Sequence, residues 1–201
     1  MSGAQSGRMT MSDYLEATAF AVRRLIELVW YERDEFEESR GFVREEVDET
    51  TWNAFLAASM SGEEDQFWST YSGLGVSQLS ANNALAVLAV THRLSAAALA
   101  SALLQIARQG ISIVHGGPVS PLGRLIGTQP LSVVIWEARN QAMHWEDDQL
   151  RERLEECFET LAREIDPKYG EYRARSLAFD VADLLGWRTV DSFDDDFAAL
   201  G

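Results

Sequence analysis

Three residues with useful side-chain chemistry, Arg139, Asn140 and His144, lie within one stretch of six residues. An arginine guanidinium can hold two non-bridging oxygens of a phosphate and offset the charge that builds up in a transition state. A histidine titrates near neutral pH, so it can take a proton from a ribose 2′-hydroxyl or deliver one to a leaving 5′-oxygen. Such phosphodiester cleavage needs no metal ion and leaves a 2′,3′-cyclic phosphate. We therefore predict a catalytic site of Arg139 and His144, with the Asn140 amide orienting either neighbour.

The spacing of Arg139 and His144 sets a geometric condition on this site. Five residues along a continuous α-helix rotate the side chains by about 140° and separate them by about 7.5 Å along the axis. The two side chains then point in different directions. Either the helix ends or kinks near residues 142–145, or a two-fold dimer places two Arg/His pairs around one cleft.

Other catalytic chemistries have little support in the sequence. The three histidines are isolated, without metal-ligand spacing, and no serine lies in a Gly-x-Ser-x-Gly elbow. Cys157 is the single cysteine, so it forms no internal disulfide, and its charged helical surroundings favour a small packed side chain over a nucleophile. We expect no metal and no cofactor.

Apolar residues recur at helical spacing along most of the chain, and no strand-like alternation is sustained. The pattern predicts helices over residues 12–39, 50–71, 76–109, 131–143, 146–163 and 172–185, with a Gly/Pro-rich loop over 115–130 and Gly110 as the end of the third helix. We predict an all-α fold, a helical bundle of about five or six helices. It forms one domain, 1–201, with a loose N-terminus, 1–11, and an acidic C-terminal tail, 188–201, that packs loosely or docks on a basic partner.

Composition narrows the possible partners and location. The formal charge of −15 argues against a broad electrostatic surface for nucleic acid, although a small basic site remains compatible with it. The N-terminus lacks the pattern of a secretion signal, and the apolar stretch 84–106 contains His92, Arg93 and Gln105, which favours a buried helix over a membrane span. We expect a cytoplasmic protein without a membrane segment, in which His92 makes a structural hydrogen bond.

The segment Arg139-Asn140-x-x-x-His144, at the end of an apolar helix, resembles the signature of the HEPN superfamily. Ribonucleases of that superfamily carry Arg, a polar residue and then His after a short spacer. The resemblance implies a HEPN-like bundle, usually a homodimer with the two Arg/His sets facing each other at the interface. It also implies a metal-independent endoribonuclease that acts on RNA as a toxin or antiphage-defence effector, with an antitoxin or defence-complex protein as a possible partner.

A second Arg/His pair, Arg108 and His115, has similar spacing. Gln109 and Gly110 follow that arginine, and a helix ending at Gly110 would separate the pair. The Asn after Arg139 and the helical setting favour the later pair.

The alternative function is a non-catalytic HEPN-like binding or regulatory module in a defence or toxin–antitoxin complex, because a fold does not determine a function. In that case Arg139 and His144 would be buried in protein contacts. Simple structural roles are an ion pair of Arg139 with Glu137 or Glu146, and packing of His144 beside Trp145.

Overall fold

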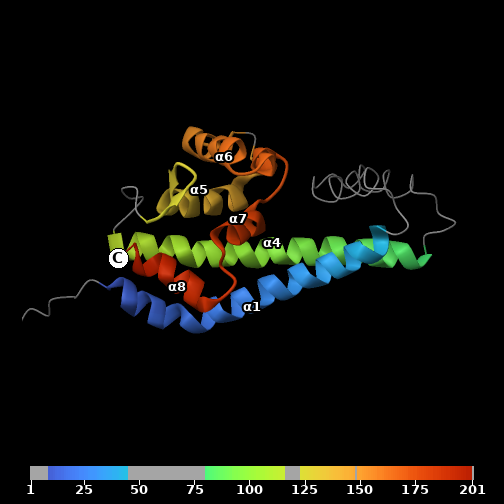
Figure 1. The fold of residues 1–201 in the computed structure, drawn as a ribbon, viewed down its shortest axis with the longest axis horizontal. Helices are drawn as coiled ribbons and strands as arrows, with labels where there is room; N and C mark the ends of the chain where they lie inside the picture. The colour runs from blue at the N-terminus through green and yellow to red at the C-terminus, as the bar shows by residue number, and fades with distance from the viewer. Residues whose placement is uncertain (1–8, 45–79, 116–122, 148, 201) are drawn as a thin grey trace, which may run out of the picture.

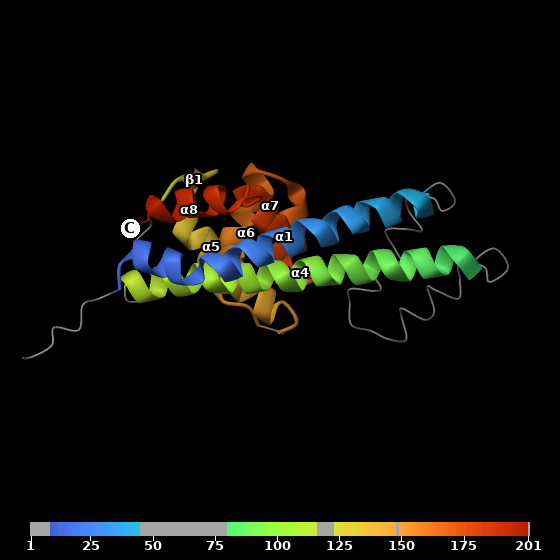
Figure 2. The ribbon, with the colours of Figure 1, turned by 90° about the horizontal axis from the view of Figure 1, so that it is seen from below.

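Two long helices form the frame of the computed structural model, which describes residues 9–44, 80–115, 123–147 and 149–200. Helix α1 spans Met11–Arg44 and helix α4 spans Ser80–His115. They run antiparallel and side by side (Figures 1 and 2). Thr10 and Asp13 begin α1 with reciprocal hydrogen bonds, since the Thr10 amide donates to the Asp13 carboxylate and the Asp13 amide donates to the Thr10 hydroxyl.

The remaining elements are short and pack against the half of the α1–α4 pair that contains Met11 and His115, while the other half extends beyond them (Figures 1 and 2). In chain order they are strands β1 (Leu125–Ile126) and β2 (Gln129–Pro130), helix α5 (Leu131–His144), helix α6 (Glu152–Glu164), the 3-10 helix η1 (Pro167–Arg173), helix α7 (Ala178–Leu185) and helix α8 (Val190–Ala198). The predicted all-α bundle is confirmed. The expected helix over 50–71 lies outside the described residues.

Two expected elements differ in detail from the structure. The two short strands pair antiparallel inside the expected loop. Of the last predicted helix, 172–185, only Ala178–Leu185 form α7. Its first two residues belong to η1, which begins at Pro167 with the Asp166 side chain capping the Lys168 amide at 2.9 Å.

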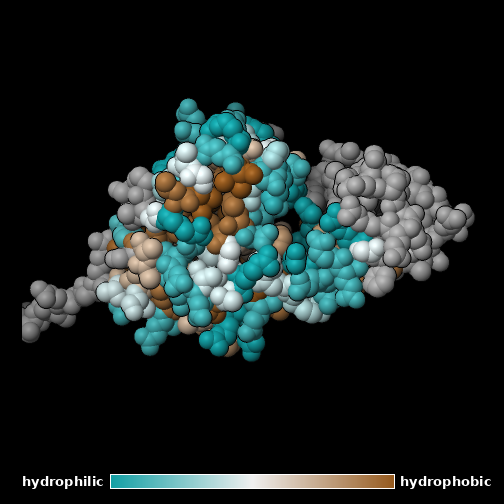
Figure 3. All heavy atoms as spheres, viewed as in Figure 1, coloured by the Kyte–Doolittle hydropathy of each residue, from teal (hydrophilic) through white to brown (hydrophobic). Residues whose placement is uncertain are grey.

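The core lies where α4 meets the short helices. Ala100, Leu103, Leu104 and Ala107 of α4 have no exposed surface, and the small alanines allow neighbouring helices to approach closely. The face in Figure 3 carries hydrophilic side chains along much of α1 and a hydrophobic area over the short helices.

One helix of the described part, over Leu85–His115, is long and apolar enough to cross a membrane by length and composition. Part of the same helix, including Leu103, Leu104 and Ile111, belongs to the core of the bundle, so the fold is compatible with a soluble protein.

The prediction that Gly110 ends the third helix is wrong. Helix α4 continues through Gly110 to His115. A Cβ atom at Gly110 would lie 2.7 Å from the Tyr14 ring, so the glycine permits α1 to approach α4. Its local helix-breaking tendency of about 1 kcal/mol is offset by this packing.

The prediction that the acidic tail packs loosely is also wrong. Residues 190–198 form α8, whose Phe193 and Phe197 are fully buried with Trp187. Asp196 is buried too, and its carboxylate accepts hydrogen bonds from the Trp187 indole at 2.9 Å and from Arg124 at 2.6 Å. The Asp196 carboxylate is therefore buried and paired, whereas the acidic composition of the tail had suggested solvent-exposed charges.

Candidate functional site

Helix α5 carries the predicted site residues, and its position in the bundle is fixed by two kinds of contact. Leu131, Val134 and Ile135 are fully buried in the core. On the same helix the Gln141 amide, also fully buried, donates to the carbonyls of Tyr172 and Arg175 and accepts from the Leu177 amide. The sequence analysis assigned no role to Gln141, which holds α5 against the segment between η1 and α7.

A cavity of about 210 Å³ lies at the C-terminal end of α5. It brings together all three predicted site residues with side chains from α4, from the segment before α6 and from the first turn of α6: Arg108, Arg139, Asn140, His144, Asp147, Gln149, Leu150, Arg151 and Leu154. Helix α5 is continuous through His144, so the chain turns only after the pair, and Arg139 and His144 line the cavity from one unbroken helix.

His144 is open to solvent and held by one hydrogen bond. Its side chain is 53% exposed, and Nδ1 lies 3.0 Å from Oδ2 of Asp147. An ionised carboxylate only accepts hydrogen bonds, so Nδ1 carries the proton in this contact. In the neutral ring Nε2 is then the unprotonated nitrogen, which can accept a proton from another molecule.

Arg139 is half-buried and makes no ion pair with a described residue. Its Nε donates to Oε1 of Gln105 on α4 at 2.5 Å, and this contact leaves both terminal nitrogens for a ligand. Burial lowers the pKa of Arg139 from its usual value, and the neighbouring Arg108 guanidinium lowers it further. The predicted ion pairs with Glu137 or Glu146 are absent among the described contacts of Arg139.

Arg108 provides a second guanidinium at the cavity. Its Cζ lies 4.0 Å from the centre of the Trp136 ring, a cation–π contact. Its Nε is buried without a hydrogen-bond partner in the described part of the chain. Two neighbouring guanidiniums, contacting an amide and an indole instead of carboxylates, leave positive charge facing the cavity.

Asn140 lies in the cavity wall but orients neither Arg139 nor His144. It is 8% exposed, and its Nδ2 donates to Oε2 of the buried Glu137 at 3.1 Å. The other Glu137 oxygen lies 3.5 Å from Nε of Arg153 on α6. Glu137 therefore connects α5 to α6, and Asn140 holds the second oxygen of Glu137 while lining the cavity.

The remaining histidines and the cysteine lie elsewhere. His92 Nδ1 lies 2.7 Å from the Glu32 carboxylate, which confirms its predicted structural hydrogen bond between α1 and α4. His115 is outside the cavity lining, whereas Arg108 of the same alternative pair is inside it. Cys157 is buried in the core, and burial raises the pKa of its thiol to about 12, with a smaller contribution from Glu137.

No family model matches the sequence, and no curated protein or solved structure matches it either.

Proposed function

We propose that the protein is a metal-independent endoribonuclease of HEPN type. The observation that carries this proposal is the convergence of Arg139, Arg108 and His144 on one cavity, with neither guanidinium neutralised by a described carboxylate. An anionic phosphodiester supplies the charge that this arrangement lacks. The exposure of His144 supports an enzyme over a module in which the same residues are covered by protein.

In the proposed reaction Nε2 of His144 takes the proton of a ribose 2′-hydroxyl. The 2′-oxygen forms a bond to the adjacent phosphorus, and the bond from phosphorus to the 5′-oxygen breaks. Arg139 and Arg108 stabilise the charge on the non-bridging oxygens, and an imidazolium returns a proton to the leaving 5′-oxygen. The products are a 2′,3′-cyclic phosphate and a 5′-hydroxyl.

The proposed setting is a cytoplasmic toxin or antiphage-defence effector that acts as a homodimer. Helix α4 leaves Val87, Leu94 and Ile113 between 45% and 48% exposed, and a second copy could cover this apolar surface. The charge of −15 limits nonspecific binding to RNA, because counterion release by basic residues supplies most of that affinity. A protein partner such as an antitoxin fits the strongly acidic composition of the chain.

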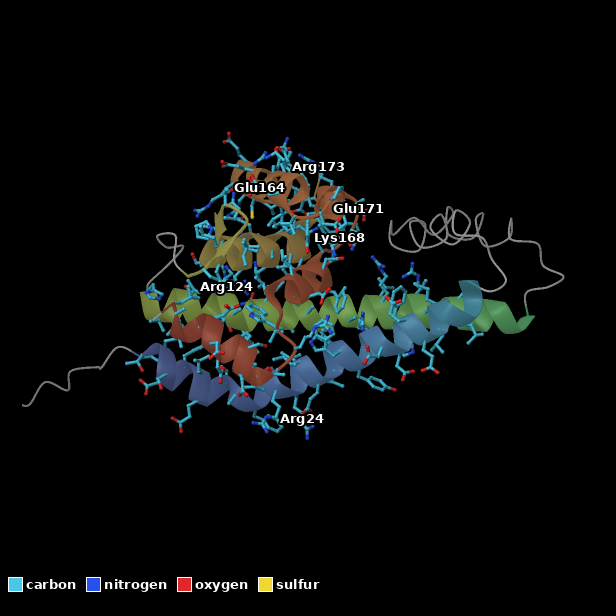
Figure 4. The ribbon with its side chains drawn as sticks, in the orientation of Figure 1. Arg24, Arg124, Glu164, Lys168, Glu171 and Arg173 are labelled. Atoms are coloured by element: carbon cyan, nitrogen blue, oxygen red, sulfur yellow. The ribbon has the colours of Figure 1, made fainter. Side chains whose placement is uncertain are left out.

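The test is cleavage of total cellular RNA in EDTA by the purified wild-type chain and by folded Arg139→Ala and His144→Ala variants. Arg24→Ala is the matched control, because Arg24 lies on the outer side of α1 in an exposed ion pair with Glu27 (Figure 4). We expect cleavage by the wild type and the control, with cyclic-phosphate ends, and a loss of about 10²–10⁴-fold in each site variant.

Equal cleavage by all four proteins would assign the activity to a contaminant. Absence of cleavage in every protein, with and without candidate partners, would favour the regulatory module.

A further inference from the structure

A second and larger cavity, of about 400 Å³, lies on the other side of α5 and contains no residue of the proposed catalytic site. Its walls come from α1, α4, the end of α5 and the η1–α7 region. Five basic and three acidic side chains line it: Arg33, Arg40, Arg93, Lys168, Arg175, Glu37, Asp180 and Asp183. Lys168 projects from η1 on the side where α1 and α4 extend beyond the short helices (Figure 4).

Each carboxylate of this cavity already has a basic partner. Asp180 pairs with Arg175 at 2.6 Å and lies 3.8 Å from Lys168. Glu37 lies 3.5 Å from Arg40, and Asp183 pairs with Arg188 outside the cavity at 2.8 Å.

Arg93 remains without a carboxylate at ion-pair distance in the described part of the chain. Its guanidinium lies 5.5 Å from the centre of the Phe36 ring, and the Arg40 guanidinium lies 6.0 Å from the same centre. The Nε of Arg40 is buried without a hydrogen-bond partner among described residues. Two guanidiniums therefore lie near one aromatic ring, Arg93 without a described carboxylate partner and Arg40 with Glu37 as its only one among described residues.

The electrostatics of Arg93 agree with this geometry. Burial lowers its pKa first, and the charges of Arg175 and Arg40 lower it further, while Asp180 and Glu171 act in the opposite direction. An anion between Arg93 and Arg40 would relieve the repulsion and use their donors.

We propose that this cavity binds a small phosphate-bearing ligand of the nucleotide class. A phosphate group has enough oxygens to accept from both guanidiniums at once. Phe179 and Trp145 add aromatic surface to the same walls, against which a planar base can pack. The volume exceeds the needs of a lone phosphate and falls within the range of about 300–1,000 Å³ that small-molecule sites occupy.

The test is calorimetric titration of the full chain with AMP, ADP, adenosine and inorganic phosphate. We expect AMP or ADP to bind with a Kd below about 1 mM, and adenosine and phosphate to bind at least about tenfold more weakly, because each offers half of the contacts. Arg93→Gln should weaken AMP binding by at least about tenfold, and Arg24→Gln should leave it unchanged. If Arg93→Gln does not fold, Arg40→Gln gives the same test from the other guanidinium.

The Arg139→Ala variant shows which cavity binds the nucleotide, because Arg139 lines only the proposed RNA-cleavage cavity. Retention of AMP binding in Arg139→Ala, together with its loss in Arg93→Gln, supports the proposal whether or not the protein cleaves RNA. Loss in Arg139→Ala with retention in Arg93→Gln would place the nucleotide in the RNA-cleavage cavity and overturn it. Absence of AMP and ADP binding below about 1 mM would overturn it as well.

Discussion

The two cavities beside α5 both gather guanidinium groups, yet the other side chains of their linings differ in chemistry. The smaller cavity adds the imidazole of His144, a side chain that can accept and donate a proton, to Arg108 and Arg139. The larger one adds aromatic rings and paired carboxylates to Arg93 and Arg40, and its lining contains no histidine among the described residues. The basic side chains therefore favour anion binding in both cavities, whereas proton transfer by a histidine is possible only at the smaller one among the described residues.

The largest expected effect separates catalysis from binding. His144→Ala should lower RNA cleavage by about 10²–10⁴-fold, because it removes the proton acceptor. Arg93→Gln should lower cleavage by less than about tenfold, because it removes charge without touching the proton transfer. Initial cleavage rates in EDTA at one protein concentration measure both.

Similar losses in the two variants would contradict the division into two sites. Melting curves of both variants are the necessary control, since a common loss of fold would give the same result.

The sequence predicts the long helices because local signals and tertiary packing agree there. The apolar spacing of α1 and α4 gives their identity directly, and α5 ends within one residue of its prediction. Two predictions were wrong because the local sequence pattern and the tertiary packing disagree. Gly110 reads as a helix end but serves close packing, and the acidic residues of α8 conceal a buried pair, Phe193 and Phe197.

The candidate site was predictable only in part. Arg139 and His144 lie near each other in the chain, so their spacing is visible. Gln105 and Arg108 lie some thirty residues before Arg139, on α4. No local sequence pattern predicts that they lie next to Arg139 in the fold. The pairing of Asn140 with Glu137, three residues apart on one helix, is a local contact that spacing could suggest, whereas the ion pair of Glu137 with Arg153 of α6 is not local.

A second prediction concerns α5, the helix that contributes residues to both cavities. Gln141→Met should destabilise the protein by about 3 kcal/mol, because it leaves two carbonyls and one amide buried without their hydrogen bonds. Gln109→Met, at an exposed position of α4, should change stability by less than about 0.5 kcal/mol. Urea unfolding followed by circular dichroism measures both.

If Gln141→Met folds at low denaturant, both cavities should be altered together. Cleavage and AMP binding are then expected to fall in parallel. A variant that lost one and fully kept the other would show that Gln141 does not position their common helix.

The smallest expected effect concerns the carboxylate behind His144. Asp147→Asn should lower RNA cleavage by about tenfold or less, because an amide can present either oxygen or nitrogen to Nδ1 and no longer fixes Nε2 as the acceptor. Stability should stay within about 0.5 kcal/mol, since both side chains are more than half exposed and such pairs contribute little to folding. Asp147→Glu, which keeps the charge, should recover part of the lost rate. A loss in Asp147→Asn as large as that in His144→Ala would instead place the carboxylate in direct contact with the reacting atoms, and the smaller cavity would then differ from the larger one by two catalytic groups.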